Sequence, residues 1–92
     1  MQFLVRIKSN LPADYPTDKR EKLLAAEEKR AQELHDTGAL VATWRIAVAN
    51  ETVTLWEAAD ALQLHQWLMS LPAMPWAEAR VEPVIDRNLM PH

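Results

Sequence analysis

The spacing of apolar residues in this chain switches between the two-residue period of a β-strand and the longer period of a helix, and the order of these switches is the feature that most constrains the fold. Residues 2–9 alternate between apolar and polar side chains, which predicts a strand. Residues 18–36 have helical spacing, with Thr17 placed to cap the helix and Gly38 placed to end it. The chain is therefore expected to begin with a strand followed by a helix.

In the rest of the chain we expect two strands, at residues 39–48 and 51–56. A helix at residues 58–70 and a last strand at residues 76–86 are expected to follow. Ala49 and Asn50 separate the first two of these strands as in a tight hairpin, and the prolines of residues 71–75 end the helix. Pro83 favours an edge or bulged position for the last strand, and residues 87–92 are expected to form a loose tail. This order predicts a single ferredoxin-like α+β domain over residues 1–92, with two helices on one face of a four-stranded antiparallel sheet.

The other face of that sheet also needs a cover. One side of the strand expected at residues 39–48 carries Leu40, Ala42, Trp44, Ile46 and Val48, and Val41 and Ala47 make the other side partly apolar. Hydrophobic residues form 49% of only 92 residues, a large apolar content for so small a domain. We therefore expect a homodimer in which two sheets pack face to face, a dimeric α+β barrel.

Composition excludes several classes of protein. The chain has no cysteine, hence no disulfide or thiolate metal site, and its three histidines are too scattered to predict a metal site. A net charge of −3 with both signs interleaved argues against nucleic-acid binding. Residues 1–10 are too short and too alternating for a signal peptide, and no stretch approaches the roughly 20 apolar residues that span a bilayer. No membrane partner is expected, and a cytoplasmic location is the default.

Glu27 is the most informative single residue. Helical spacing of about 100° per residue places it in the middle of a stripe formed by Leu23, Ala31 and Leu34. A carboxylate on a core-facing stripe is costly unless it is paired or protonated, and this is the setting in which a general base or acid is often found. Glu27 is therefore a candidate catalytic residue. The alternative is that it reaches water at the helix margin or pairs with Arg30.

His65 and Arg45 are the next candidates. His65 is expected on or near the buried face of the second helix, as a catalytic group or as a core histidine bonded to a carbonyl. Arg45 is expected to point opposite to Trp44, into a cavity beneath the helices, and to bind a substrate anion; the alternative is a surface ion pair. Trp44, Asn50 and Trp76 complete the candidate substrate-binding set. The tryptophans as a group also suit core and interface positions.

Many short motifs along the chain have the spacing of one known family. They are Leu11-Pro12, Glu27 with Lys29, Ala31-Gln32, Leu34, Gly38, Trp44-Arg45-Ile46-Ala47, Leu64-His65, Leu68, Leu71-Pro72, Pro75 and Trp76. Through their combined spacing over residues 1–84, the sequence resembles the muconolactone delta-isomerases of aromatic-ring degradation.

The resemblance implies a cofactor-free 1,3-proton shift on an unsaturated five-membered lactone that carries a carboxymethyl group. Glu27 would remove the ring proton next to the lactone oxygen and return it two carbons away, with Arg45 and His65 as supporting groups. The resemblance also implies dimers that assemble further, often into decamers.

The sequence departs from the family at three places. Family members carry a lysine three residues before the glutamate, where this chain has Leu24, and a Gly-x-Tyr segment where it has Val48-Ala49-Asn50. A His-Pro pair near the C-terminus corresponds to Arg87-Asn88. These changes favour a more apolar pocket and a different lactone or polyketide-like substrate. Two alternatives stay open: a dehydrohalogenation or cyclisation on the same barrel, and a non-catalytic ligand-binding or assembly module.

Overall fold

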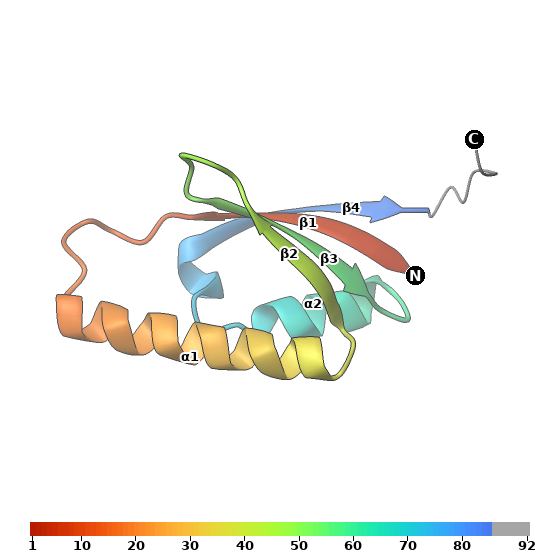
Figure 1. Ribbon diagram of the computed structural model, residues 1–92, viewed down its shortest axis with the longest axis horizontal. Coiled ribbons are helices and arrows are strands. Elements are labelled where there is room, and N and C mark those ends of the chain that lie inside the picture. Colours follow the sequence, from red (N-terminus) through yellow and green to blue (C-terminus); the bar gives the residue numbers. More distant parts are fainter. Residues whose placement is uncertain (86–92) are drawn as a thin grey trace.

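The structure, a computed structural model, describes residues 1–85. In chain order its elements are β1 (Gln2–Ser9), α1 (Thr17–Asp36), β2 (Leu40–Arg45), β3 (Glu51–Glu57), α2 (Ala61–Met69), the 3₁₀ helix η1 (Met74–Trp76) and β4 (Ala77–Val84) (Figure 1). The end of the last predicted strand at Asp86 and the tail expected at residues 87–92 lie outside the described residues.

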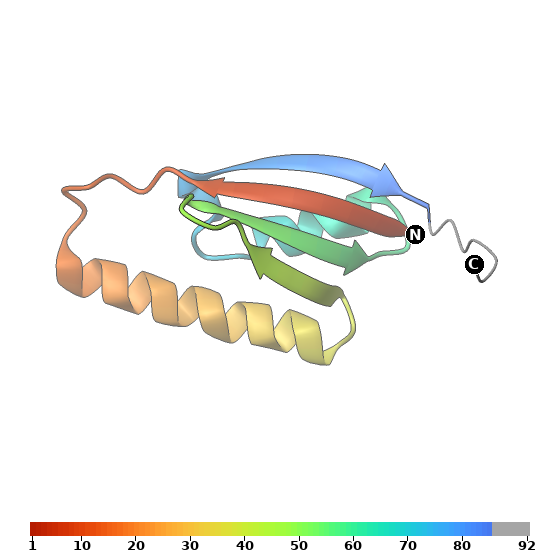
Figure 2. The ribbon, with the colours of Figure 1, turned by 45° about the horizontal axis from the view of Figure 1, so that its top comes forward.

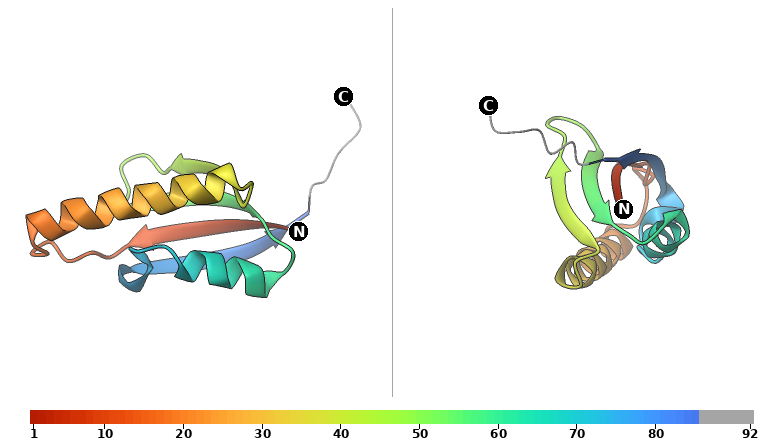
Figure 3. Two further views of the ribbon diagram at one scale, coloured as in Figure 1. Left: turned by 90° about the horizontal axis from the view of Figure 1, so that it is seen from below. Right: turned by 90° about the vertical axis from the view of Figure 1, so that its right-hand side faces the viewer.

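The four strands form one sheet in the order β2-β3-β1-β4, and every neighbouring pair is antiparallel. Both helices lie on the same face of this sheet (Figures 2 and 3). The ferredoxin-like α+β arrangement predicted from the sequence is thereby confirmed. Pro83 lies on the edge strand β4, opposite Phe3 of β1, which is the kind of position expected for a residue without a backbone N–H.

The core lies between the sheet and the two helices. Its buried apolar side chains come from every layer: Phe3, Val5, Leu34, Ala39, Leu40, Trp56, Ala58, Leu64, Leu68 and Leu71. Trp56 is 1% exposed, and its indole N–H donates to the hydroxyl of Thr54 at 2.7 Å. The Thr54 hydroxyl in turn donates to the carbonyl of Val5 at 2.9 Å, so the buried polar atoms are satisfied. No helix in the described part of the chain is long and apolar enough to cross a membrane.

The second strand differs from the prediction in both its length and its faces. Its pairing with β3 shifts register between Leu40 and Ala42. Leu40 lies opposite the buried Trp56 and faces the helices, whereas Trp44 lies opposite Val53 and faces the open side of the sheet. The prediction that these residues share one side is wrong, because an extra residue in one strand reverses the side to which later residues point.

The connection after β2 is also longer than predicted. The strand ends at Arg45, and residues 46–50 form a loop in place of a two-residue hairpin. Such a short hairpin favours residues that tolerate positive φ, and the sequence supplies no glycine here. Val48 adopts the left-handed conformation in this loop, with φ of 63° and its side chain fully exposed.

The helix ends follow the predictions in part. Gly38 has φ of 85° just after α1 and ends the helix as expected. Thr17 is the first residue of α1 and not its cap, because Pro16 occupies that position and no side chain caps the helix. The second helix begins three residues later than predicted, at Ala61, because the Asp60 side chain accepts a hydrogen bond from the N–H of Gln63 at 2.8 Å.

Candidate active site

A cavity of about 370 Å³ lies beside α1, at the end of the sheet where β1 and β2 finish and β3 and β4 begin. The residues around it come from α1, from the nearby ends of all four strands and from the segments that follow β1, precede β3 and precede β4: Ile7, Ser9, Leu11, Arg20, Leu24, Glu27, Arg45, Asn50, Thr52, Ala73, Met74 and Ala77. The volume is in the range of small-molecule sites. Half of the lining residues are apolar and half are polar or charged, so the cavity suits a ligand with both kinds of group.

Glu27 is the carboxylate of this cavity. It is half-buried on α1, and its Oε2 accepts a hydrogen bond from the backbone N–H of Ala73 at 2.7 Å. Ala73 is the N-cap of η1, where backbone N–H groups lack partners within the helix. Within residues 1–85 the second oxygen, Oε1, accepts no hydrogen bond. One oxygen therefore fixes the carboxylate, and the other is available to a molecule in the cavity.

The alternative pairing of Glu27 with Arg30 does not occur. The Arg30 guanidinium donates to Glu33 at 3.1 Å and to the Ser70 hydroxyl at 3.0 Å, which ties α1 to the end of α2. Glu27 thus lies at the predicted position between Leu23 and Ala31, both half-buried, without an arginine partner on its own helix.

Arg45 and Asn50, two of the predicted substrate-binding residues, line the same cavity as Glu27. Arg45 is the last residue of β2 and lies opposite Thr52, which also lines the cavity. Its guanidinium is 3.5 Å from the side-chain oxygen of Asn50, a long and weak contact. No carboxylate among the described residues forms an ion pair with Arg45. The predicted surface ion pair is therefore absent there, and the cation faces the cavity.

Arg20 and Leu24 also line the cavity, and the sequence reasoning missed Arg20. Arg20 precedes Glu27 by seven residues, which is about two helical turns, so both side chains share one face of α1. The spacing alone could have identified it. Its guanidinium donates to the carbonyl of Pro12 at 2.7 Å.

His65 is not on the buried face of α2, and this prediction is wrong. Leu64 and Leu68 are the buried residues of the helix and set the direction of its apolar face, which leaves His65 exposed. His65 does not line the cavity of Glu27. A direct catalytic role therefore has no geometric support within this chain.

The two candidate tryptophans also lie apart from the cavity. Trp44 is 52% exposed and faces the open side of the sheet. Trp76 is half-buried and packs edge-on against Tyr15, with ring centroids 5.6 Å apart. Neither side chain lines the cavity, although Met74 and Ala77 beside Trp76 do.

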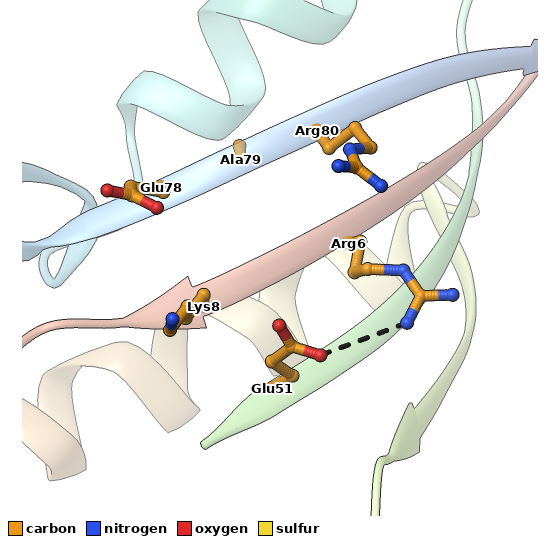
Figure 4. Close-up of a pocket in the computed structure, with 6 residues that line it drawn as sticks. All are labelled: Arg6, Lys8, Glu51, Glu78, Ala79 and Arg80. Atoms are coloured by element: carbon orange, nitrogen blue, oxygen red, sulfur yellow. Dashed lines mark ion pairs between the residues drawn. The ribbon is translucent and has the colours of Figure 1, made fainter. Parts of the chain in front are cut away.

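A second hollow, of about 380 Å³, lies on the open face of the sheet (Figure 4). Its charged residues are Arg6, Lys8, Glu51, Glu78 and Arg80, and the Arg6–Glu51 ion pair measures 3.8 Å. Opposite charges that project side by side from neighbouring strands are typical of a solvated or protein-facing sheet surface. The cavity of Glu27 is therefore the stronger candidate active site. No group of His, Asp and Glu residues among residues 1–85 could hold a metal ion.

The family model and the curated relatives that match this sequence belong to one family. A family model described as muconolactone delta-isomerase matches residues 1–88. The muconolactone delta-isomerase of Acinetobacter baylyi is 30% identical over 81 residues, which cover 88% of this chain and 84% of that protein. The corresponding enzyme of Pseudomonas aeruginosa is 30% identical over 82 residues, 89% of this chain and 85% of its own length.

The fold comparison agrees with these similarities. A crystal structure of muconolactone isomerase superposes with a TM-score of 0.91, covering 100% of this chain and 96% of that chain at 29% identity. The chain thus shares both the sequence pattern and the complete fold of these proteins.

Proposed function

Because the chain belongs to the muconolactone delta-isomerase family, we propose that it catalyses a cofactor-free 1,3-proton shift on an unsaturated lactone in the breakdown of aromatic compounds. The observation that carries the proposal is the Glu27 carboxylate, which lines a cavity of small-molecule size with one oxygen held and the other free. This isomerase activity is favoured over dehydrohalogenation, cyclisation or a purely structural role, because the relatives are named isomerases along nearly the whole chain.

The proposed reaction needs one proton carrier. Oε1 of Glu27 removes the ring proton next to the lactone oxygen, and the electrons of that C–H bond spread over the conjugated system as a dienolate. Glu27, now protonated, returns the proton two carbons away on the same face, and the double bond moves. The step transfers one proton within one molecule, so it needs no oxidant or reductant.

Arg45 is the proposed binding group for a substrate anion. A planar guanidinium suits a carboxylate or an enolate oxygen, and Arg45 lies in the cavity with only a weak contact to Asn50. Leu24, 54% exposed at the cavity wall, supplies an apolar surface at the position where family members are expected to have lysine. We therefore propose a substrate with one anionic group and an apolar body, a lactone that need not be muconolactone.

The test is incorporation of deuterium from solvent. The protein, incubated in D₂O with a carboxymethyl-substituted unsaturated γ-lactone, is expected to exchange the ring proton and to form the isomer, both visible by proton NMR. Binding of the lactone with neither exchange nor isomerisation would contradict the proposed proton shift and favour a ligand-binding module.

We also propose that a second copy of the chain covers the open face of the sheet. Trp44 lies exposed on this face, with the partly exposed Leu4, Val53 and Leu55 from the neighbouring strands. The charged part of the same face carries both signs, as Figure 4 shows, so a two-fold partner can place carboxylates opposite cations across the interface. Exposed apolar surface of this kind marks an interface more often than a solvated face.

A further inference from the structure

The cavity contains a second cation that neither the sequence pattern nor the family resemblance identified. Arg20 and Arg45 are the two arginines of its lining, and Glu27 is its one carboxylate. Ion pairs within residues 1–85 involve Arg6, Arg30 and the N-terminal amine but neither of these two arginines. The cavity therefore has an excess of positive charge before any ligand enters.

The charges balance only when an anionic substrate is bound. With a substrate carboxylate in place, the two guanidinium groups face two negative charges, one on Glu27 and one on the substrate. After proton transfer Glu27 is neutral, and the substrate carries both its carboxylate and the dienolate charge. Two cations still face two anions, so the summed charge of these groups stays zero throughout the reaction.

The position of Arg20 suits a side-chain group that projects from the lactone ring toward the N-terminal end of α1. Seven residues along a helix correspond to about 10 Å between the backbones of Arg20 and Glu27. Side chains on a helix lean toward its N-terminus, so the guanidinium of Arg20 extends away from Glu27. Leu24 lies between them on the same face and lines the same cavity. Along α1 the cavity thus presents a cation, an apolar side chain and a carboxylate, in that order.

The hydrogen bond to the Pro12 carbonyl fixes the direction of Arg20. This bond, 2.7 Å long, uses Nη2 and ties the guanidinium to the loop after β1. Four of the five donor N–H bonds of a guanidinium remain once one is used, which is enough for a bidentate contact with a carboxylate.

We propose that Arg20 is a second substrate-binding residue, which holds the carboxylate of the substrate's side chain while Glu27 acts on the ring. This inference rests on the proposed function for the class of substrate. It adds a specificity rule: the site prefers a lactone with a free carboxylate on a short side chain over the same lactone as a neutral ester.

The experiment measures binding without chemistry. The probes are a saturated γ-lactone that carries a carboxymethyl group and its methyl ester, neither of which has a double bond to shift. Their dissociation constants are measured by calorimetry for the wild-type protein, Arg20→Gln, Arg20→Lys and the control Lys22→Gln. Lys22 is exposed on the same helix and does not line the cavity, so its substitution removes the same charge from the chain.

Arg20→Gln is expected to weaken binding of the acid about 10- to 100-fold, the worth of a hydrogen-bonded charge contact, and to change binding of the ester less than about 3-fold. Arg20→Lys should recover part of the loss, and Lys22→Gln should change neither probe. Equal weakening of acid and ester would show that Arg20 only supports the Pro12 loop, and unchanged binding of the acid would also overturn the proposal. A failure of the deuterium test with normal discrimination between acid and ester would refute the isomerase proposal alone.

Discussion

Replacement of Glu27 by glutamine is the most direct test of the proton shift. The substitution keeps the volume and one carbonyl-type oxygen but removes the group that accepts and returns the proton. If Glu27 is the proton carrier, kcat should fall by about 10²- to 10⁴-fold, the usual contribution of a general base. That loss corresponds to about 3–5 kcal/mol in the activation barrier.

The expected change in stability is much smaller and follows from the contact with Ala73. A hydrogen bond to a charged acceptor contributes about 1.5–3 kcal/mol and a neutral one about 0.5–1.5 kcal/mol. The glutamine oxygen can still accept from the Ala73 N–H, so the free energy of unfolding should change by about 1–1.5 kcal/mol, the difference between the corresponding ends of these two ranges. The effect on the barrier therefore exceeds the effect on folding.

Activity and stability can be measured on the same preparations. Deuterium exchange into the unsaturated carboxymethyl lactone gives the rate, and thermal unfolding followed by circular dichroism gives the stability. Glu28→Gln is the matched control, because Glu28 is the adjacent exposed carboxylate and does not line the cavity. The assignment of Glu27 would be refuted by a Gln variant that unfolds readily while its remaining activity follows only the folded fraction.

Three further outcomes are expected. Arg45→Lys should lower kcat/KM about 10- to 100-fold with little change in Tm, because its one side-chain contact in the structure is long; a large loss of Tm with unchanged kinetics would contradict an anion-binding role. Trp44→Glu should convert a homodimer to monomer in sedimentation at micromolar concentration, and a monomeric wild-type protein would contradict the face-to-face assembly. Val48→Asn should raise the free energy of unfolding by about 1 kcal/mol in chemical denaturation, because asparagine tolerates the left-handed conformation that strains valine. Ala47→Asn, one residue earlier in the same loop, should give no such gain if the backbone of Val48 is the cause.

The order of the elements could be predicted because it depends on local interactions. Strand alternation in residues 2–9 and helical spacing up to Asp36 are visible in the sequence, and Gly38 supplies the positive φ that ends the helix. The short connections then leave few topologies for six elements, and the observed sheet order is one of these. The helix starts were less predictable, since Thr17 and Asp60 are both capping residue types and only Asp60 caps a helix.

The candidate site was predictable where one helix or one strand carries it. The position of Glu27 on its helical stripe and the direction of Arg45, opposite to Trp44, both followed from periodicity. The prediction failed for His65, because several apolar residues of α2 are compatible with more than one buried face, and packing chose Leu64 and Leu68. Arg20 had a readable signal in its spacing from Glu27, but an arginine near a helix start is usually solvated.

The sequence by itself determined which segments are strands and helices. It also determined that Glu27 of α1 is a carboxylate within an apolar stripe. Both could be read locally, because hydrogen bonding and side-chain direction within an element depend on near neighbours. Only the tertiary structure decided the register shift at Leu40, which sends Trp44 to the open face, and the bond that joins Glu27 to Ala73, 46 residues away. These contacts arise when distant segments pack. Their geometry depends on the side chains of both partners, and the periodicity of either segment contains no information about the other.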